Sequence, residues 1–369
     1  MRVGLIFDRE RLDQEHASLS RLVVGLLAEG IAVTRLIPDN FDPFSEDVRE
    51  RRLGLVSRLS YPARSLPWLR GAAADRLAES LERAMPDLFH AIGEESWRLA
   101  TAISQRMERP LVVDIWSAAQ ARTAPARRHA ASVAAYLVPT EPIGEALGHR
   151  VDPDLVRLVT PSIGPAPLHT NALERSDEEV VFAVIGEGKD LAAYRDLLGG
   201  IRRLVDERHQ VQVVLEIKGP HGHDVWRCAR SLELLPFVSS IADAGPMRTP
   251  LMQCDALVVP ERTGVMRSVL IEAMAAGVPV VAASDPMLRG VLGPDTAEIV
   301  ETPSPERWFR TLTTLIADPA ATRRRAAAVR SLAESRFQSS ARVEGVTAVY
   351  EEALSDPALP FTRDVDRTA

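Results

Sequence analysis

Short apolar runs alternate with amphipathic helical patterns along most of this chain, and this alternation constrains the fold more than any other feature of the sequence. An order of strand, helix and strand predicts a parallel sheet that is covered by helices on both faces. In the first half, the runs and the patterns between them occupy residues 2–7, 18–30, 31–37, 72–84, 87–92, 94–107, 110–116, 132–139 and 141–149.

The alternation is interrupted once and then restarts. The segment LVTPSIGPAP (158–167) is rich in Pro and Gly and is typical of a linker. After it, the runs and patterns occupy residues 180–186, 194–209, 210–219, 223–234, 256–260, 268–276, 278–282 and 298–302, and helices fill most of 305–354. We therefore predict two tandem doubly wound, Rossmann-like α/β domains, at 1–160 and 168–340, and a frayed tail at 357–369.

Composition limits the classes of protein that fit this pattern. The chain has 369 residues, 46% of them hydrophobic, which is enough for two domains. Its net charge of -7 does not favour nucleic-acid binding, which usually needs a basic surface. Cys228 and Cys254 are too few for a disulfide framework, and no segment approaches the length of a membrane span. We expect a cytoplasmic protein.

The segment SVLIEAMAAGVPVVAASD (268–285) contains a carboxylate in an otherwise apolar stretch. Ser268 is a plausible N-cap, Gly277 and Pro279 end the helix, and a buried strand follows. Glu272 then lies in the first turns, where the helix dipole favours an anion. It is either an acid that merely suits the dipole or a ligand contact at the helix mouth, facing a cleft between the two domains.

Residues 254–285, CDALVVPERTGVMRSVLIEAMAAGVPVVAASD, resemble the nucleotide-sugar segment of the retaining glycosyltransferases of the GT-B fold, in particular the large family four. The pair Arg336-Phe337 and the segment VYEEAL (349–354) are similar to that family's C-terminal region. The resemblance implies a nucleotide-sugar side in the C-terminal domain, an acceptor side in the N-terminal domain, and a helix at 341–356 that crosses back to the N-terminal domain.

The resemblance also implies a reaction and a site. A sugar would pass from a nucleotide-sugar donor to an unknown acceptor with retention, without a cofactor and without a metal. Glu272 would contact the ribose hydroxyls, and the backbone amides of Arg267, Ser268 and Val269 would hold the pyrophosphate.

Several positions depart from that family's pattern. Gly264 stands where the family has a second acid, and Glu261 lies three residues earlier. Glu187 stands in the place of an Arg that neutralises the leaving diphosphate, and Lys189 is not in register with the family's Lys. Trp116 replaces a His, and the stretch DRERLDQEHAS (8–18) lacks the family's glycines.

Other candidates keep two interpretations. Arg267 either adds positive charge near the phosphates or is a solvated loop residue, and we favour the second. Lys218, at the end of a strand, either faces the cleft or lies on the surface. His90 either has an acceptor-side, catalytic role or is hydrogen-bonded structure. His221 and His223 lack an obvious third ligand, so we expect no metal there.

Residues 46–71 combine six arginines with leucines and a tryptophan, a composition typical of a segment that docks on anionic lipid or on a protein. The alternative is an excursion that packs on the sheet. For the whole chain two hypotheses remain open: a glycosyltransferase, and a catalytically degenerate GT-B protein that serves as a binding module or as the partner subunit of an active enzyme.

Overall fold

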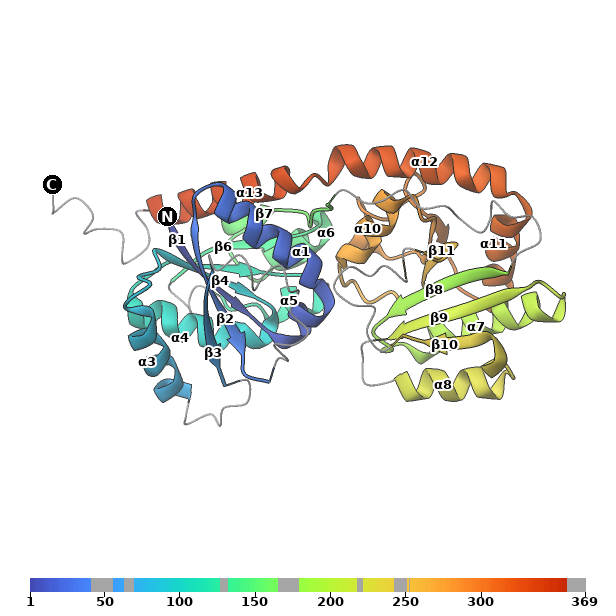
Figure 1. The fold of residues 1–369 in the computed structure, drawn as a ribbon, viewed down its shortest axis with the longest axis horizontal. Coiled ribbons are helices and arrows are strands. Elements are labelled where there is room, and N and C mark those ends of the chain that lie inside the picture. The colour runs from blue at the N-terminus through green and yellow to red at the C-terminus, as the bar shows by residue number, and fades with distance from the viewer. Residues whose placement is uncertain are drawn as a thin grey trace. The chain divides into compact units, whose positions relative to one another are not determined.

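The structure is a computed structural model, and it describes residues 1–40, 56–62, 70–126, 132–164, 179–217, 222–241, 251 and 253–356. The chain forms two compact units, which Figure 1 shows with their elements labelled. Unit 1 comprises Met1–Ser162 and Ser339–Ala369, and unit 2 comprises Ile163–Gln338.

Unit 1 is built on a parallel sheet of seven strands in the order β3-β2-β1-β4-β5-β6-β7. The strands are β1 (Arg2–Phe7), β2 (Ala32–Pro38), β3 (Ser57–Tyr61), β4 (Leu88–Ile92), β5 (Leu111–Asp114), β6 (Val133–Val138) and β7 (Val156–Leu158). Its helices are α1 (Arg9–Ala28), α3 (Arg70–Leu81), α4 (Trp97–Met107), α5 (Ala118–Thr123), α6 (Glu141–Gly148) and α13 (Ser339–Ser355).

Unit 2 is built on a parallel sheet of six strands in the order β10-β9-β8-β11-β12-β13. The strands are β8 (Val180–Gly186), β9 (Val211–Ile217), β10 (Val238–Ser240), β11 (Ala256–Val259), β12 (Val280–Ala283) and β13 (Glu298–Val300). Its helices are α7 (Leu191–Asp206), α8 (Gly222–Ser231), α10 (Ser268–Ala276), α11 (Pro305–Ala317) and α12 (Pro319–Arg336). The prediction of two doubly wound, Rossmann-like halves is confirmed.

The described residues correct two local predictions. The first helix begins at Arg9 rather than near residue 18, because Asp8 caps it through a hydrogen bond from the backbone N–H of Arg11. Glu15 interrupts this helix with φ -124° and ψ 19°. No strand was predicted between residues 38 and 71, yet β3 lies there and pairs with β2. Residues 41–55 and 63–69, most of the predicted docking segment, lie outside the described residues.

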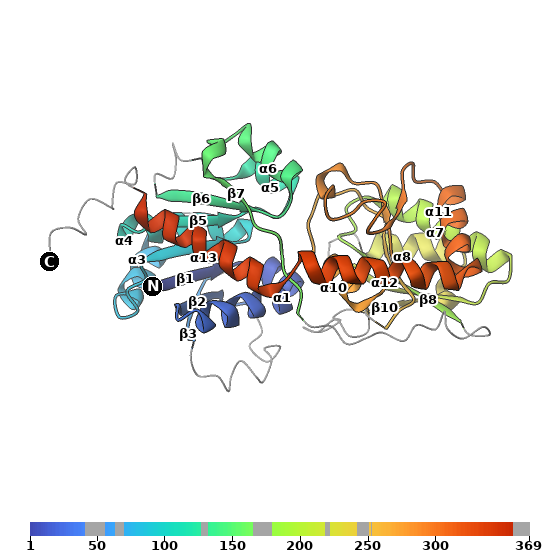
Figure 2. The same ribbon diagram turned by 90° about the horizontal axis from the view of Figure 1, so that it is seen from above.

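Helix α13 completes the core of unit 1, although it is far along the chain from the other elements of that unit. Val346 and Tyr350 of this helix are fully buried in the same cluster as Leu5, Leu22 and Val112. Figures 1 and 2 both place α13 beside α1 and across the sheet. None of the described helices is long and apolar enough to cross a membrane.

Candidate functional site

Helix α10 follows β11 and begins at the carboxyl edge of the unit 2 sheet, where ligands of doubly wound proteins bind. Its N-cap is Arg267, in an extended conformation, and not Ser268, which is the first helical residue. The helix ends as predicted at Gly277, whose φ of 78° places it in the left-handed conformation that glycine adopts without strain.

Glu272 is the only residue of α10 that is not buried; the other eight pack into unit 2. It is the fifth helical residue, one turn beyond Ser268, whose hydroxyl lies 3.3 Å from Glu272 Oε1. The acid therefore lies in the second turn of the helix. A half-buried carboxylate at this edge can accept hydrogen bonds from the hydroxyl groups of a ligand.

Arg267 is buried, so the favoured prediction of a solvated loop residue is wrong. The residue is 5% exposed, and its Nη2 lies 3.7 Å from Oε2 of Glu216, near the end of β9. Glu216 is 2% exposed. A buried charge must be paired, and here a carboxylate of β9 supplies the pairing. The guanidinium thus lies beside the first turn of α10 as half of an ion pair.

Glu261 holds the loop between β8 and α7. Its Oε2 accepts hydrogen bonds from the backbone N–H groups of Glu187 (2.6 Å) and Gly188 (3.0 Å) and from the hydroxyl of Tyr194 (2.8 Å). Its Oε1 accepts one from the N–H of Asp190 at 2.8 Å. A cradle of converging N–H groups is the kind of structure that binds anions, and in this chain an internal carboxylate occupies it.

The glycines around this loop show how closely it is packed. A Cβ on Gly186 would collide with the Tyr194 hydroxyl and with Glu261 Oε2, and Gly188 has a φ of 71°. Burial, followed by the charge of Glu261, raises the pKa of Tyr194 well above its ordinary value. The tyrosine therefore stays protonated as a donor to Glu261, and Glu261 cannot contact a sugar unless these bonds break.

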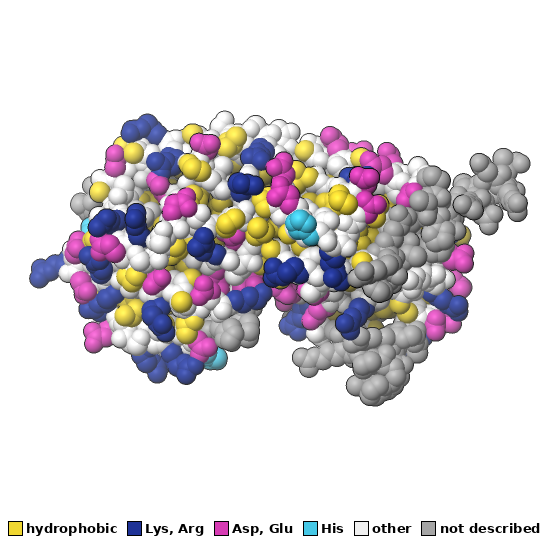
Figure 3. Space-filling view, turned by 180° about the vertical axis from the view of Figure 1, so that it is seen from behind, with side chains coloured by type: hydrophobic (Ala, Val, Ile, Leu, Met, Phe, Trp, Pro, Cys, Tyr) yellow, Lys and Arg dark blue, Asp and Glu magenta, His cyan; other side chains and the backbone are white. Residues whose placement is uncertain are grey.

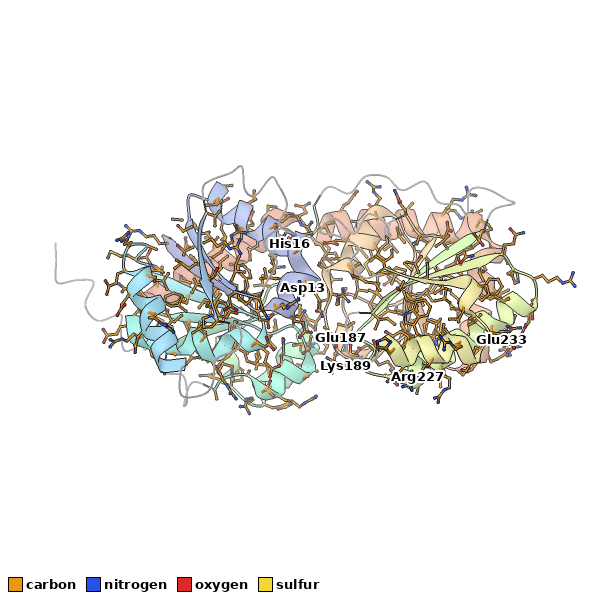
Figure 4. The ribbon with its side chains drawn as sticks, turned by 60° about the horizontal axis from the view of Figure 1, so that its bottom comes forward. Asp13, His16, Glu187, Lys189, Arg227 and Glu233 are labelled. Atoms are coloured by element: carbon orange, nitrogen blue, oxygen red, sulfur yellow. The ribbon has the colours of Figure 1, made fainter. Side chains whose placement is uncertain are left out.

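Glu187 and Lys189 of the same loop form an ion pair, and Figure 4 shows them next to each other. The Glu187 side chain is 6% exposed, whereas that of Lys189 is 58% exposed. The carboxylate therefore lies against the loop and the ammonium group reaches solvent. Of the predicted cations that the structure describes, Lys189 is exposed and Arg267 is buried, and part of the charge of Lys189 is balanced by Glu187.

Gly264, which stands where the resembled family has a second acid, is fixed by a hydrogen bond to Asp285. Its N–H donates to Oδ2 of Asp285 at 2.7 Å, and its φ is 64°. The structure thus brings Gly264, Arg267, Ser268, Val269 and Glu272 together on the β11–α10 connection. Lys218 and His221 lie outside the described residues.

His90 lies in unit 1 and is fully buried. Its Nδ1 is 2.7 Å from the hydroxyl of Tyr350, and its Nε2 is 3.2 Å from Oδ1 of Asp114. Burial would raise the pKa of Asp114, but His90 and then Arg342 hold it below its ordinary value. His90 thus joins β4 to β5 and to α13, which is the hydrogen-bonded structure that the sequence allowed as one of two interpretations.

The sequence did not assign Asp285, Tyr194 or Glu216 to this site. Each comes from a different element and reaches a partner 21 to 67 residues away, and no local motif indicates such pairings. Glu261 was noticed only as a possible substitute acid. Among the described residues, no group of three or more His, Cys, Asp or Glu side chains could hold a metal ion.

Comparison with known proteins adds a family model and several solved structures. Residues 170–331 match the model described as glycosyl transferases group 1. No curated protein matches the sequence.

Among solved structures, the chain is similar to HepE of Anabaena in complex with UDP and glucose, with a TM-score of 0.74 and 13% identity over 95% of this chain and 99% of that one. It is also similar to sucrose-phosphate synthase from Thermosynechococcus elongatus, with a TM-score of 0.73 and 15% identity over 96% of this chain and 99% of that one. A glycosyltransferase from Rickettsia africae has a TM-score of 0.73 and 11% identity over 96% and 99% of the two chains.

At these identities the likeness establishes the fold, and the family model adds the domain type of unit 2. The chain therefore has the GT-B fold of glycosyltransferases, and its residues 170–331 match the family model of glycosyl transferases group 1.

Proposed function

We propose that this protein transfers a sugar, with retention, from a nucleotide-sugar donor bound by unit 2 to an acceptor that is not yet identified. One observation carries the proposal: within the segment matched by the glycosyl transferases group 1 model, α10 buries eight of its nine residues and leaves only Glu272 at the surface. A carboxylate at the carboxyl edge of a doubly wound sheet suits the two hydroxyl donors of a ribose.

The first turn of α10 supplies the second part of the donor site. The leading N–H groups of a helix have no partner within the helix, and with the dipole they favour a phosphate. We assign the pyrophosphate to the amides of Arg267, Ser268 and Val269. An acid at position 264 would hold the donor sugar by hydrogen bonds. Gly264 has no side chain, so we expect the donor sugar to be held less firmly.

Stabilisation of the leaving diphosphate is the difficult step for this site. Negative charge grows on that group in the transition state, and preorganised cations and amides must balance it. Lys189 is paired with Glu187, and Arg267 with Glu216. We therefore assign most of the balance to helix amides, with Lys189 and Lys218 as candidate cations, and we expect slow turnover.

The donor base is proposed from the solved structures. HepE was solved with UDP and with UDP-glucose. UDP is therefore the first nucleotide to test, with GDP and ADP beside it.

The proposal is tested by calorimetric titration of the full chain with the three nucleotides. We expect one of them to bind, and Glu272→Gln and Glu272→Ala to weaken it by about tenfold or more, because hydrogen bonds to a charged group contribute roughly 1.5–3 kcal/mol. The control is Glu207→Ala, which removes an exposed acid at the C-terminal end of α7, on the amino edge of the same sheet. Equal affinities for wild type and both Glu272 variants would refute the donor site.

Retention and turnover need a separate measurement. Incubation with UDP-sugars and candidate acceptors, followed by proton NMR of the anomeric position, would show whether the product keeps the donor's configuration. An inverted product would overturn the retaining assignment. Tight nucleotide binding without release of sugar from any donor would instead support the binding-module hypothesis, which the family-model match does not favour.

A further inference from the structure

Two arginines of unit 1 lie against the same tryptophan at the carboxyl edge of its sheet. The guanidinium carbon of Arg11 is 5.3 Å from the centre of the Trp116 ring, and that of Arg342 is 5.4 Å away. Trp116 follows β5, Arg11 is in the first turn of α1, and Arg342 is on α13. Both distances are within the range of cation–π attraction, so the indole holds two positive charges in one small region.

The hydrogen-bond donors of these arginines are not all used. Arg11 is 2% exposed, and its Nε and Nη1 have no hydrogen-bond acceptor in the described part of the chain. Arg342 is 5% exposed; its Nη1 donates to the Ser18 hydroxyl at 3.0 Å, but its Nε likewise lacks an acceptor there. A buried guanidinium without acceptors is costly, so unused donors of this kind call for an explanation, and a bound anion is one that would satisfy them.

The surrounding acids do not supply those acceptors. Asp8 is the acid beside Arg11, and its oxygens already accept from the N–H groups of Arg11 (2.7 Å) and Glu95 (3.3 Å). Burial raises the pKa of Asp8 to about 6, so near pH 6 its negative charge is only partly present. Asp114 and Glu15 lie near Arg342, as do Arg21 and Tyr350, yet the Arg342 Nε still has no acceptor among the described residues.

The position along the chain adds an independent reason to expect an anion. Helix α1 begins directly after Asp8, whose carboxylate caps the N–H of Arg11, so the first-turn N–H groups that remain at the end of β1 are those of Arg9 and Glu10. Gln14 is three residues further along, on the same face of the helix, and its buried Oε1 has no donor among the described residues. Figure 4 shows the neighbouring Asp13 and His16 on this part of α1.

We propose that Arg11, Arg342 and the first turn of α1 bind a phosphate group carried by the acceptor, with Trp116 as the platform and Gln14 accepting a hydroxyl of the same molecule. The unused N–H groups of the two arginines would donate hydrogen bonds to phosphate oxygens. The amide oxygen of Gln14 would accept one from a sugar or alcohol hydroxyl. That the ligand is the acceptor rests on the proposed function; that the site binds a phosphate group does not.

The test is a calorimetric titration of the full chain with inorganic phosphate, glucose 6-phosphate and glucose, each with and without UDP. We expect the two phosphates to bind, glucose 6-phosphate the more tightly, and glucose alone to show no heat. Phosphate bound at the donor helix would be displaced by UDP, whereas phosphate at Arg11 would remain. Arg11→Gln should weaken phosphate binding by about tenfold or more.

Two further variants separate binding from folding. Asp8→Asn keeps a capping side chain but removes the acid beside Arg11, so it should tighten phosphate binding at pH 7, opposite to Arg11→Gln. Arg9→Gln is the matched control, because Arg9 is in the same turn but exposed and paired with Asp13. Wild-type phosphate affinity in Arg11→Gln, or no phosphate binding by the wild type, would overturn the inference.

The outcomes also distinguish this inference from the proposed function. Glu272→Gln should weaken nucleotide binding and leave the titration with glucose 6-phosphate unchanged, and Arg11→Gln should do the reverse. If nucleotide binding depends on Glu272 but phosphate binding is unchanged in Arg11→Gln, the phosphate site alone is refuted. If phosphate binding depends on Arg11 but nucleotide binding is unchanged in Glu272→Gln, the donor site alone is refuted.

Discussion

At the scale of single residues, the most consequential side chain of unit 2 is a buried glutamate that holds a loop. Glu261 accepts four hydrogen bonds from the β8–α7 loop and its flanking helix. The cradle that could receive a phosphate is therefore closed by the protein itself, and the loop's conformation depends on one carboxylate.

We predict that replacement of Glu261 loosens this loop in proportion to the hydrogen bonds lost. Glu261→Gln can keep its oxygen toward Glu187, Gly188 and Tyr194 but turns an NH₂ toward the N–H of Asp190, which costs about 1–2 kcal/mol. Glu261→Ala leaves all four donors without the carboxylate and costs roughly 3 kcal/mol or more. Hydrogen exchange of the amides of residues 187, 188 and 190 measures the effect.

The matched control for the Glu261 variants is Glu301→Gln, an exposed acid just after β13 of the same sheet. It should leave the exchange of the loop amides unchanged. If Glu261→Ala exchanged at the wild-type rate, the loop would owe its conformation to other contacts.

Asp8 gives unit 1 a predicted dependence of stability on pH. Its pKa is raised from 3.8 to about 6, chiefly by burial, so folding favours the protonated acid. The unfolded chain ionises first as the pH rises, and stability falls between about pH 4 and pH 6 by roughly 3 kcal/mol. In Asp8→Asn the side chain cannot ionise, so the free energy of unfolding should not decrease over this pH range. Urea unfolding of wild type and variant across this range is the measurement, and parallel curves would contradict it.

At the scale of elements, helix α7 approaches α11 of unit 2 closely enough to require a glycine in its interior. A Cβ on Gly200 would lie 2.7 Å from Trp308 Cβ and 2.9 Å from both Phe309 N and Pro305 O. Trp308 is fully buried. Glycine has a low helix propensity, but here it allows α7 and α11 to pack in close contact.

We therefore predict that Gly200→Ala destabilises unit 2, although alanine is the better helix former by about 1 kcal/mol. Displacement of α11 should cost roughly 1–3 kcal/mol more than that gain. Gly222→Ala is the control, since a Cβ there meets nothing within 4 Å and the change should be neutral or slightly stabilising. Thermal unfolding compares the two, and a Gly200→Ala protein more stable than wild type would show that the helices can move apart without cost.

At the scale of the whole molecule, unit 1 is assembled from two distant parts of the chain. Its sheet comes from the first 162 residues, and α13 comes from the end. The buried Val346 and Tyr350 of α13 belong to the same core as the strands, and the Tyr350 hydroxyl reaches His90 across 260 positions of sequence. Unit 2, by contrast, is one continuous segment.

This arrangement predicts how fragments behave. Residues 1–162 alone should fail to fold cooperatively, because the surface that α13 covers would be exposed. Residues 1–162 joined by a flexible linker to 339–356 should recover a cooperative transition, and residues 163–338 should fold by themselves. Circular dichroism with thermal unfolding tests all three. A cooperative transition for 1–162 alone would show that α13 is dispensable.

On Figure 3, basic and acidic side chains are interspersed across the visible face. This mixture accords with the modest net charge of the sequence, -7 over 369 residues. Whether residues 46–71 dock on lipid stays a prediction, to be tested by co-sedimentation with anionic vesicles at low salt.

The sequence by itself determined the two doubly wound sheets, most of their strands and helices, and the end of α10 at Gly277, but it missed β3, β7, β10 and α5. These features follow from hydrophobic periodicity and from turn residues, which act over a few neighbouring positions. It also indicated Glu272, because one acid in an apolar helix is visible without knowledge of its neighbours.

Only the tertiary structure decided what the other charged residues do. Arg267 is buried and pairs with Glu216, and Glu261 accepts hydrogen bonds from a loop 71 to 74 residues away. Arg11 and Arg342 both contact Trp116. Each of these outcomes depends on which side chains packing brings within a few ångströms and removes from water. No local pattern records such a neighbour, because the partners come from strands and helices far apart in the chain.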